Sequence, residues 1–260
     1  MTGGLKTASF YTVHCSDRVI MRTKGGASKE KIANSPKFAG MRKQQKEFGG
    51  CSKFELATRV AFGGLQRLAD YNLSPVLNGL GKSIQKLDTD SEVGKRRIQL
   101  SKCKQVLDGF NFNRNYPFNT IVRVSPSFKI DRANLKATVT IPRINTDVDL
   151  LNIQRLPYFR LITSLGTVSD LRYNASLNAY EYVVDELRGI FVTHTGEWNS
   201  AQTILPEHSL TVQMDDCFAK LLTDEVSVVL CLAVEFGKVG FNSETVEVKY
   251  AGCGKVLCVR

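Results

Sequence analysis

The chain has 260 residues, of which 43% are hydrophobic, and its formal net charge is +10. This length and composition suffice for one large core or two modest ones, so stability requires neither a metal nor disulfides, and the disordered class is excluded. No window approaches the roughly 18 to 20 apolar residues of a membrane-spanning helix, and the first residues lack the apolar stretch of a classical secretion signal. We therefore expect no membrane partner.

The cysteines indicate a reducing compartment. They are odd in number and scattered without a framework spacing, and one of them lies inside the apolar run VVLCLAV. This pattern is typical of free thiols. We therefore expect a cytoplasmic location as synthesised, while release by lysis or by a dedicated machine, as part of an extracellular or phage-like assembly, stays open. The seven positions are 15, 51, 103, 217, 231, 253 and 258.

A β-hairpin is predicted over residues 1–26. Residues 7–14 and 18–24 are β-prone runs joined by Cys15-Ser16-Asp17. Nothing in the first hundred residues resembles a third strand beside them. Because a lone hairpin is marginally stable in water, we expect it to pair with the C-terminal sheet or with another subunit.

A basic segment of about four helices is predicted over residues 27–113. Ser35-Pro36 fits the start of the first helix, which is expected to stop at Gly49-Gly50. Ser52 and Glu55 have the spacing of a capping box and predict the start of the second helix.

The third and fourth helices follow from apolar spacing. Ser74-Pro75 begins the third, and the fourth is expected over residues 91–109, where Leu100, Cys103 and Leu107 would share one face. We expect these apolar stripes to pack into a core.

An all-β domain is predicted over residues 114–260, after the Asn- and Pro-rich stretch FNFNRNYPFN. Short β-prone runs separated by turn residues favour an antiparallel β-sandwich, Ig-like or jelly-roll-like, and hence the α+β class. The run EVSVVLCLAVEF is apolar on both faces, which predicts a central strand. The expected strands are 120–124, 135–142, 158–164, 179–184, 189–194, 209–214, 225–236, 245–250 and 255–260.

No catalytic or cofactor-binding residue is predicted. His194, Glu197 and His208 resemble a loose metal or acid-base set, but no further ligand is indicated. Asp215-Asp216 is more typical of a turn than of a cation site, and Cys217 would need a matched base to act as a nucleophile. Since no phosphate-binding glycine motif occurs either, we expect a non-enzymatic protein without metal or cofactor.

The positive charge is concentrated in one part of the chain. Residues 1–114 contain 21 Lys and Arg against 9 Asp and Glu, whereas residues 115–260 contain 14 against 16. Clustered bases can bind nucleic acid or an acidic surface of another copy, although a charged helix stripe is often only the solvated face. The candidate residues for an interface or for polyanion binding are Phe10, Tyr11, Arg42, Lys43, Lys46, Lys95, Arg96 and Arg97.

One family resemblance adds to this interpretation. The signature runs through Lys24-Gly25-Gly26, Ser35-Pro36-Lys37-Phe38 and Glu47-Phe48-Gly49 to Phe110-Asn111-Phe112-Asn113. It resembles an uncharacterised family of Bacteroidetes proteins, and Leu232-Ala233-Val234-Glu235-Phe236 is similar to that family's last strands. The resemblance implies a hairpin, a helical segment and a β domain, and it implies no activity.

Two functions remain as hypotheses. The first is a structural subunit that self-assembles into a filament, tube or particle through the hairpin and the basic helices, as a homo-oligomer. The second is a nucleic-acid-associated protein that binds without sequence preference through the basic helices.

Overall fold

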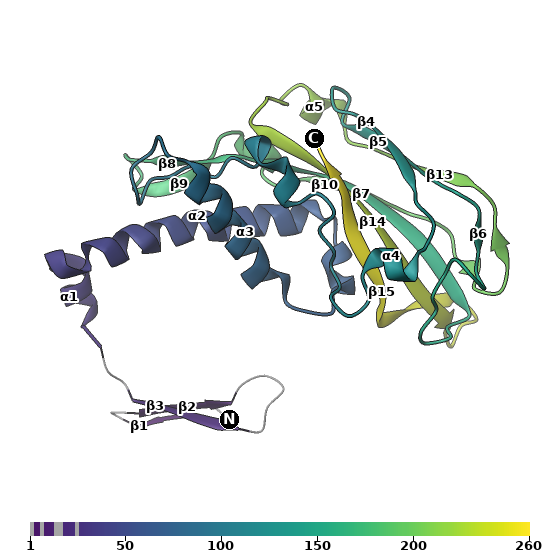
Figure 1. Cartoon of the computed structure of the whole chain (residues 1–260), viewed down its shortest axis with the longest axis horizontal. Coiled ribbons are helices and arrows are strands. Elements are labelled where there is room, and N and C mark those ends of the chain that lie inside the picture. Colours follow the sequence, from purple (N-terminus) through teal and green to yellow (C-terminus); the bar gives the residue numbers. More distant parts are fainter. Residues whose placement is uncertain (1–2, 6–7, 13–17, 24–25) are drawn as a thin grey trace. The chain divides into compact units, whose positions relative to one another are not determined.

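The computed structural model describes residues 3–5, 8–12, 18–23 and 26–260 (Figure 1). It divides into two compact units, residues 1–44 and 45–260, called unit 1 and unit 2 below. The chain begins with a hairpin, continues through helices and ends in antiparallel sheets, so the predicted α+β class is confirmed. The change in composition near residue 113 lies inside unit 2.

Unit 1 contains a three-stranded antiparallel sheet in the order β1-β2-β3. The predicted hairpin is confirmed as β2 and β3, in which Phe10 pairs with Met21. The expectation that no third strand exists is wrong: β1 pairs with β2, although Gly3 and Gly4 have little β propensity, because main-chain pairing needs no side chain. The expected turn residues 15–17 lie outside the described part of the chain. The bounds are β1 Gly3–Leu5, β2 Ala8–Thr12, β3 Val19–Thr23 and α1 Lys29–Asn34.

Helix α2, Ala39–Ala61, runs through the glycine pair that was expected to end it. The predicted break and the capping box at Ser52 are therefore wrong. Gly50 is buried, and a Cβ on it would lie 2.8 Å from the Tyr180 ring. Tertiary packing thus requires glycine there and outweighs its poor helix propensity. Glu55 binds Arg59 and the Ser74 hydroxyl instead of capping.

Replacing Gly49 with alanine should raise the free energy of unfolding by roughly 0.5 to 1 kcal/mol. An added Cβ meets nothing within 4 Å, so only the helix propensity changes. Urea unfolding followed by circular dichroism measures the effect. A helix broken at this position would show no gain.

Helix α3, Leu73–Leu87, is capped by the Asn72 side chain, which accepts the Ser74 N–H. The helix expected over residues 91–109 is wrong, because that stretch consists of turns and two 3₁₀ helices, Leu100–Lys102 and Lys104–Val106. Three carboxylates accept backbone N–H groups of this stretch. Glu47 accepts the N–H of Gly94, Asp88 accepts that of Arg97, and Asp170 accepts that of Ser101. The apolar stripe is buried as expected, but in a different backbone conformation.

Unit 2 is built on a large antiparallel sheet in the order β10-β7-β14-β15, with β11 also paired to β7. A second sheet has the order β13-β5-β4, and two short ladders pair β12 with β6 and β8 with β9. The bounds are β4 Ser127–Asp131, β5 Lys136–Ile141, β6 Ile144–Asn145, β7 Tyr158–Ser169, β8 Leu171–Asn174, β9 Ala179–Tyr182, β10 Phe191–Thr195, β11 Asn199–Ser200, β12 Ile204–Leu205, β13 His208–Gln213, β14 Val226–Val239 and β15 Thr245–Val259.

The large sheet separates two hydrophobic cores. On one face, Val229, Cys231 and Ala233 of β14 pack with helices α2 and α3; on the other, Leu230 and Leu232 pack with the β13-β5-β4 sheet. Strand β14 is therefore buried on both faces, which confirms the predicted central strand. The arrangement is a β-sandwich with helices over one outer face (Figure 1).

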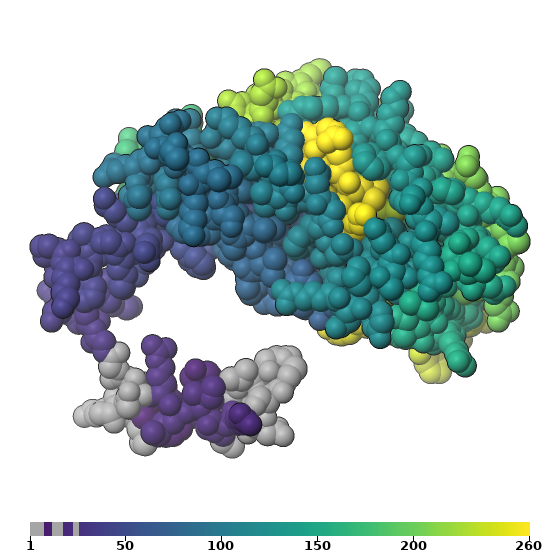
Figure 2. Space-filling model, viewed as in Figure 1, coloured from purple at the N-terminus to yellow at the C-terminus, as the bar shows by residue number. Residues whose placement is uncertain are grey.

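Two further expectations about strands are wrong. Residues 118–121 form the short helix α4, Phe118–Ile121, where a strand over 120–124 was expected. The runs 245–250 and 255–260 are parts of the single strand β15. Beside β15, residues 109–112 form backbone hydrogen bonds with 254–256, and Figure 2 shows the yellow C-terminal end of the chain at the surface.

Candidate functional site

Arg42 and Lys46, two of the predicted polyanion-binding residues, are engaged within the chain. Arg42 Nη1 donates to the carbonyl oxygens of Ile32 at 2.7 Å and Ser35 at 2.9 Å, at the end of α1. Lys46 Nζ donates to Asn178 Oδ1 at 2.7 Å. Both cations are therefore already bound to other groups of the same chain.

Arg96 is bound even more firmly. Its Nε and Nη2 donate to the two carboxylate oxygens of Glu47 at 2.7 and 2.8 Å, and Glu47 is 0% exposed. This bidentate pair occupies two of the five N–H donors of the guanidinium, and the side chain is only 16% exposed, so little of it can reach a phosphate. Arg96 therefore belongs to a buried ion pair between α2 and the loop after α3.

Further groups complete this buried cluster. Lys82 also donates to Glu47, and Gln85 Nε2 donates to the Tyr180 hydroxyl at 3.0 Å. Although burial raises the pKa of Glu47, hydrogen bonds from Arg96, Lys82 and the Gly94 N–H outweigh it and lower that pKa to about 2. The cluster joins α2, α3, the 88–97 loop and β9.

The remaining basic candidates are exposed. Lys43, Lys95 and Arg97 lie on the surface, and Lys95 forms an exposed pair of 3.0 Å with Glu92. The structure therefore does not bring the six bases together into one free patch, since Arg42, Lys46 and Arg96 serve other contacts.

The two aromatic candidates lie on an apolar sheet. Phe10 and Tyr11 are on β2, opposite Met21 and Ile20 of β3. The exposed fractions of these side chains are large: 39% for Tyr11, 62% for Val19, 38% for Ile20 and 64% for Met21. Among the described side chains of residues 8–44, none is buried.

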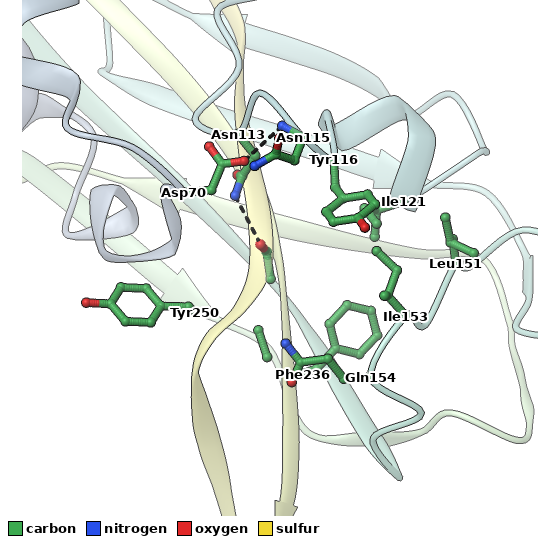
Figure 3. Close-up of a pocket in the computed structure, with 12 residues that line it drawn as sticks. Asp70, Asn113, Asn115, Tyr116, Ile121, Leu151, Ile153, Gln154, Phe236 and Tyr250 are labelled. Atoms are coloured by element: carbon green, nitrogen blue, oxygen red, sulfur yellow. Dashed lines mark hydrogen bonds between the residues drawn. The ribbon is translucent and has the colours of Figure 1, made fainter. Parts of the chain in front are cut away.

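A pocket of about 200 Å³ lies in unit 2 beside β15 (Figure 3). Figure 3 shows Asp70, Asn113 and Asn115 together at one end, and Ile121 and Leu151 further along the pocket. The apolar floor comes from these two residues together with Phe236 and Ala251. The pocket is thus apolar inside and polar at one end.

Irregular backbone forms two of its walls. Opposite β14, the pairing of β15 jumps from Glu247 to Gly252, so Tyr250 lies in a bulge and has a φ of +61°. In the other wall, Arg155 next to Gln154 has a φ of +50°. Such conformations are costly for residues other than glycine, and bulges redirect side chains, so both features are typical of functional surfaces.

The lining of the pocket combines apolar side chains with polar groups at one end. Its lining has no Lys, Arg, His or Cys among the described residues. Its one carboxylate, on Asp70, accepts the backbone N–H groups of Arg114 and Asn115 at 2.9 to 3.1 Å. The pocket therefore offers an apolar or aromatic group an apolar floor with amide groups at its edge.

A second cavity unites residues that are far apart in sequence. His194, Glu197 and His208 all line one cavity of about 290 Å³ between β10 and β13. In the described part of the chain, however, no three His, Cys, Asp or Glu side chains are close enough to hold a metal ion. His208 Nδ1 is 3.1 Å from the Pro206 carbonyl oxygen.

The described cysteines are all free thiols, and five of the six are buried. Cys231 and Cys253 lie in the cores on either face of the large sheet, where burial raises their pKa. Such thiols are poor nucleophiles. Cys217 is exposed, and a hydrogen bond with Asp215 is the main factor that raises its pKa.

Comparison with known proteins gives no relative: no family model, no curated protein and no solved structure matches the chain. The resemblance to a Bacteroidetes family stays a prediction. Within the described residues, no helix combines the length and apolar character needed to cross a bilayer.

Sequence reasoning missed the buried cluster and the pocket. The cluster had a signal: Glu47 precedes Cys51 and Phe54 at helical spacing, so it lies on the apolar face of α2 and requires a cation. The pocket had none, because its walls come from separate segments around residues 70, 113–116, 121, 151–154, 236 and 250–252.

Proposed function

We propose that this protein is a non-enzymatic structural subunit that assembles with copies of itself through its N-terminal sheet. The observation that carries the proposal is the lack of any buried side chain among the described residues of 8–44, together with the exposed apolar residues on β2 and β3. A three-stranded sheet without a buried face is not stable alone and gains stability by covering that face with a partner.

The distribution of charge also favours a second copy of the chain as this partner. Residues 1–44 contain nine Lys and Arg against two Asp and Glu. Unit 2 exposes acids where β13 connects to β14, namely Asp215, Asp216, Asp224 and Glu225. A contact between unit 1 of one copy and this acidic connection of another is heterologous, and heterologous contacts produce rings or open filaments.

The open edges of the sheet give a second means of contact. Strands β1 and β3 are the outer strands of the unit 1 sheet, and each has one neighbour there. An edge strand can add to the sheet of another chain, with main-chain hydrogen bonds providing affinity and alternate side chains providing selectivity.

The double substitution Ile20→Asp with Met21→Asp tests the proposal in the full chain. It places a charge on each face of β3, and we expect at least a tenfold fall in the mass of the assembly, measured by light scattering. The melting temperature of unit 2 should not change, because neither side chain is buried.

A matched control is Leu177→Asp, which places the same charge on a side chain that is 68% exposed in unit 2. It should leave the mass unchanged. Assembly of the double variant to the wild-type mass would contradict the proposal. Loss of mass after nuclease treatment in the wild type would instead support the nucleic-acid hypothesis.

A further inference from the structure

The hairpin of β14 and β15 ends in an exposed aromatic side chain. Phe241 is 110% exposed at the tip, next to Val239 at 52% and Val246 at 41%. The tip has a defined turn, in which the Gly240 N–H donates to the Glu244 carbonyl at 2.8 Å and the Ser243 N–H donates to the Gly240 carbonyl at 3.2 Å. A fixed turn that holds a phenyl ring in water is costly and indicates a contact with a partner.

We infer that Phe241 of one copy inserts into the pocket beside β15 of a second copy, the pocket lined by Asp70, Phe236 and Tyr250. This interface is separate from the N-terminal sheet and does not rest on it. A benzene molecule fits a cavity of about 150 Å³, so a pocket of about 200 Å³ is large enough for a phenyl ring.

The composition of the two surfaces supports this occupant. An apolar floor with a polar edge is the usual setting for an aromatic anchor at an interface. Lys238 and Glu244 are both exposed beside the tip, and Asp70 is exposed at the polar end of the pocket, so Lys238 is the tip side chain that can pair with Asp70.

The tip is directed away from the pocket of its own chain. Phe236 forms part of the pocket floor, and Val239 lies three residues further along β14, about 10 Å away. Phe241 follows beyond Val239. Insertion must therefore occur between copies, and since tip and pocket are different surfaces, the contact is head-to-tail.

The test uses the full chain that carries Ile20→Asp and Met21→Asp, so that contacts of the N-terminal sheet do not contribute. Two further variants are made in this parent: Phe241→Ser removes the tip, and Ile153→Asp charges a pocket wall that is 45% exposed. Both positions are exposed, and circular dichroism checks that each variant folds.

Sedimentation at increasing concentration should show head-to-tail oligomers of the parent and monomers of 28.9 kDa for either variant alone. An equimolar mixture should form a dimer of twice that mass, because the intact pocket of Phe241→Ser accepts the intact tip of Ile153→Asp. Leu177→Asp in the same parent should oligomerise like the parent.

Three results would overturn the inference: a monomeric parent at all concentrations, unchanged oligomers of either variant, or a mixture that stays monomeric. Each is distinct from failure of the proposed function, which would show as a parent that keeps the wild-type mass, because the N-terminal sheet would then contribute nothing to assembly. Restoring Ile20 and Met21 in Phe241→Ser separates the two contributions.

Discussion

Replacing Glu47 with alanine should lower the free energy of unfolding by about 3 to 5 kcal/mol, the usual cost of removing one member of a buried ion pair. Glu47 is fully buried, and its carboxylate accepts hydrogen bonds from Arg96, Lys82 and the Gly94 N–H. The substitution leaves two cations and a backbone donor without their acceptor. Urea unfolding at pH 7 measures the loss.

The same carboxylate should also make stability depend on pH. Because folding lowers the pKa of Glu47 from 4.5 to about 2, its contribution is complete above pH 4.5 and is lost as pH falls toward 2. The difference in unfolding free energy between wild type and Glu47→Gln should therefore shrink over that window.

Glu92→Ala is the matched control for Glu47→Ala. Glu92 pairs with Lys95 at 3.0 Å, but its side chain is 60% exposed. Such surface pairs contribute roughly 0 to 1 kcal/mol. A loss of less than 1 kcal/mol in Glu47→Ala would show that the cluster does not hold α2, α3 and β9 together.

Replacing Gly166 with alanine should destabilise unit 2 by about 3 kcal/mol or more, at the upper end of the cost of overpacking. Gly166 lies on β7, an inner strand of the large sheet, and a Cβ there would be 2.1 Å from the Ala61 carbonyl oxygen and 2.6 Å from Ala61 Cα. Both atoms are backbone, so the end of α2 must move away from the sheet. Thermal unfolding measures the effect.

Gly79→Ala is the control for Gly166→Ala. Gly79 lies in α3, and an added Cβ meets nothing within 4 Å, so alanine should be neutral or stabilising there. If Gly166→Ala unfolded at the same temperature as the wild type, the close approach of α2 to β7 would be wrong.

Local patterns in the sequence predict the β regions better than the helices. The unbroken apolar run of β14 predicts burial on both faces, and the structure confirms it. The glycine pair in α2 misleads because the contact that requires Gly50 comes from Tyr180, far along the chain. The expected helix after residue 91 fails for a similar reason, since distant carboxylates take up its N–H groups.

The candidate interface residues also divide into those whose environment local sequence patterns predict and those whose environment depends on distant contacts. Strand β2, which carries Phe10 and Tyr11, is where the β-prone run placed it, and Tyr11 is exposed while Phe10 is half-buried. The engagement of Arg96 with Glu47 could not be anticipated from a count of charges, because the two residues meet only through the packing of α2 against the 88–97 loop. Charge totals therefore overstate how many bases are free to bind a partner.

Light scattering on the purified full chain, at about 50 and 500 mM salt and before and after nuclease treatment, tests self-assembly most directly. Apolar contacts persist when charges are screened. We therefore predict an assembly many times heavier than 28.9 kDa that survives both high salt and nuclease. A monomer under all four conditions, or an assembly that dissociates only with nuclease, would contradict a subunit that assembles through its N-terminal sheet.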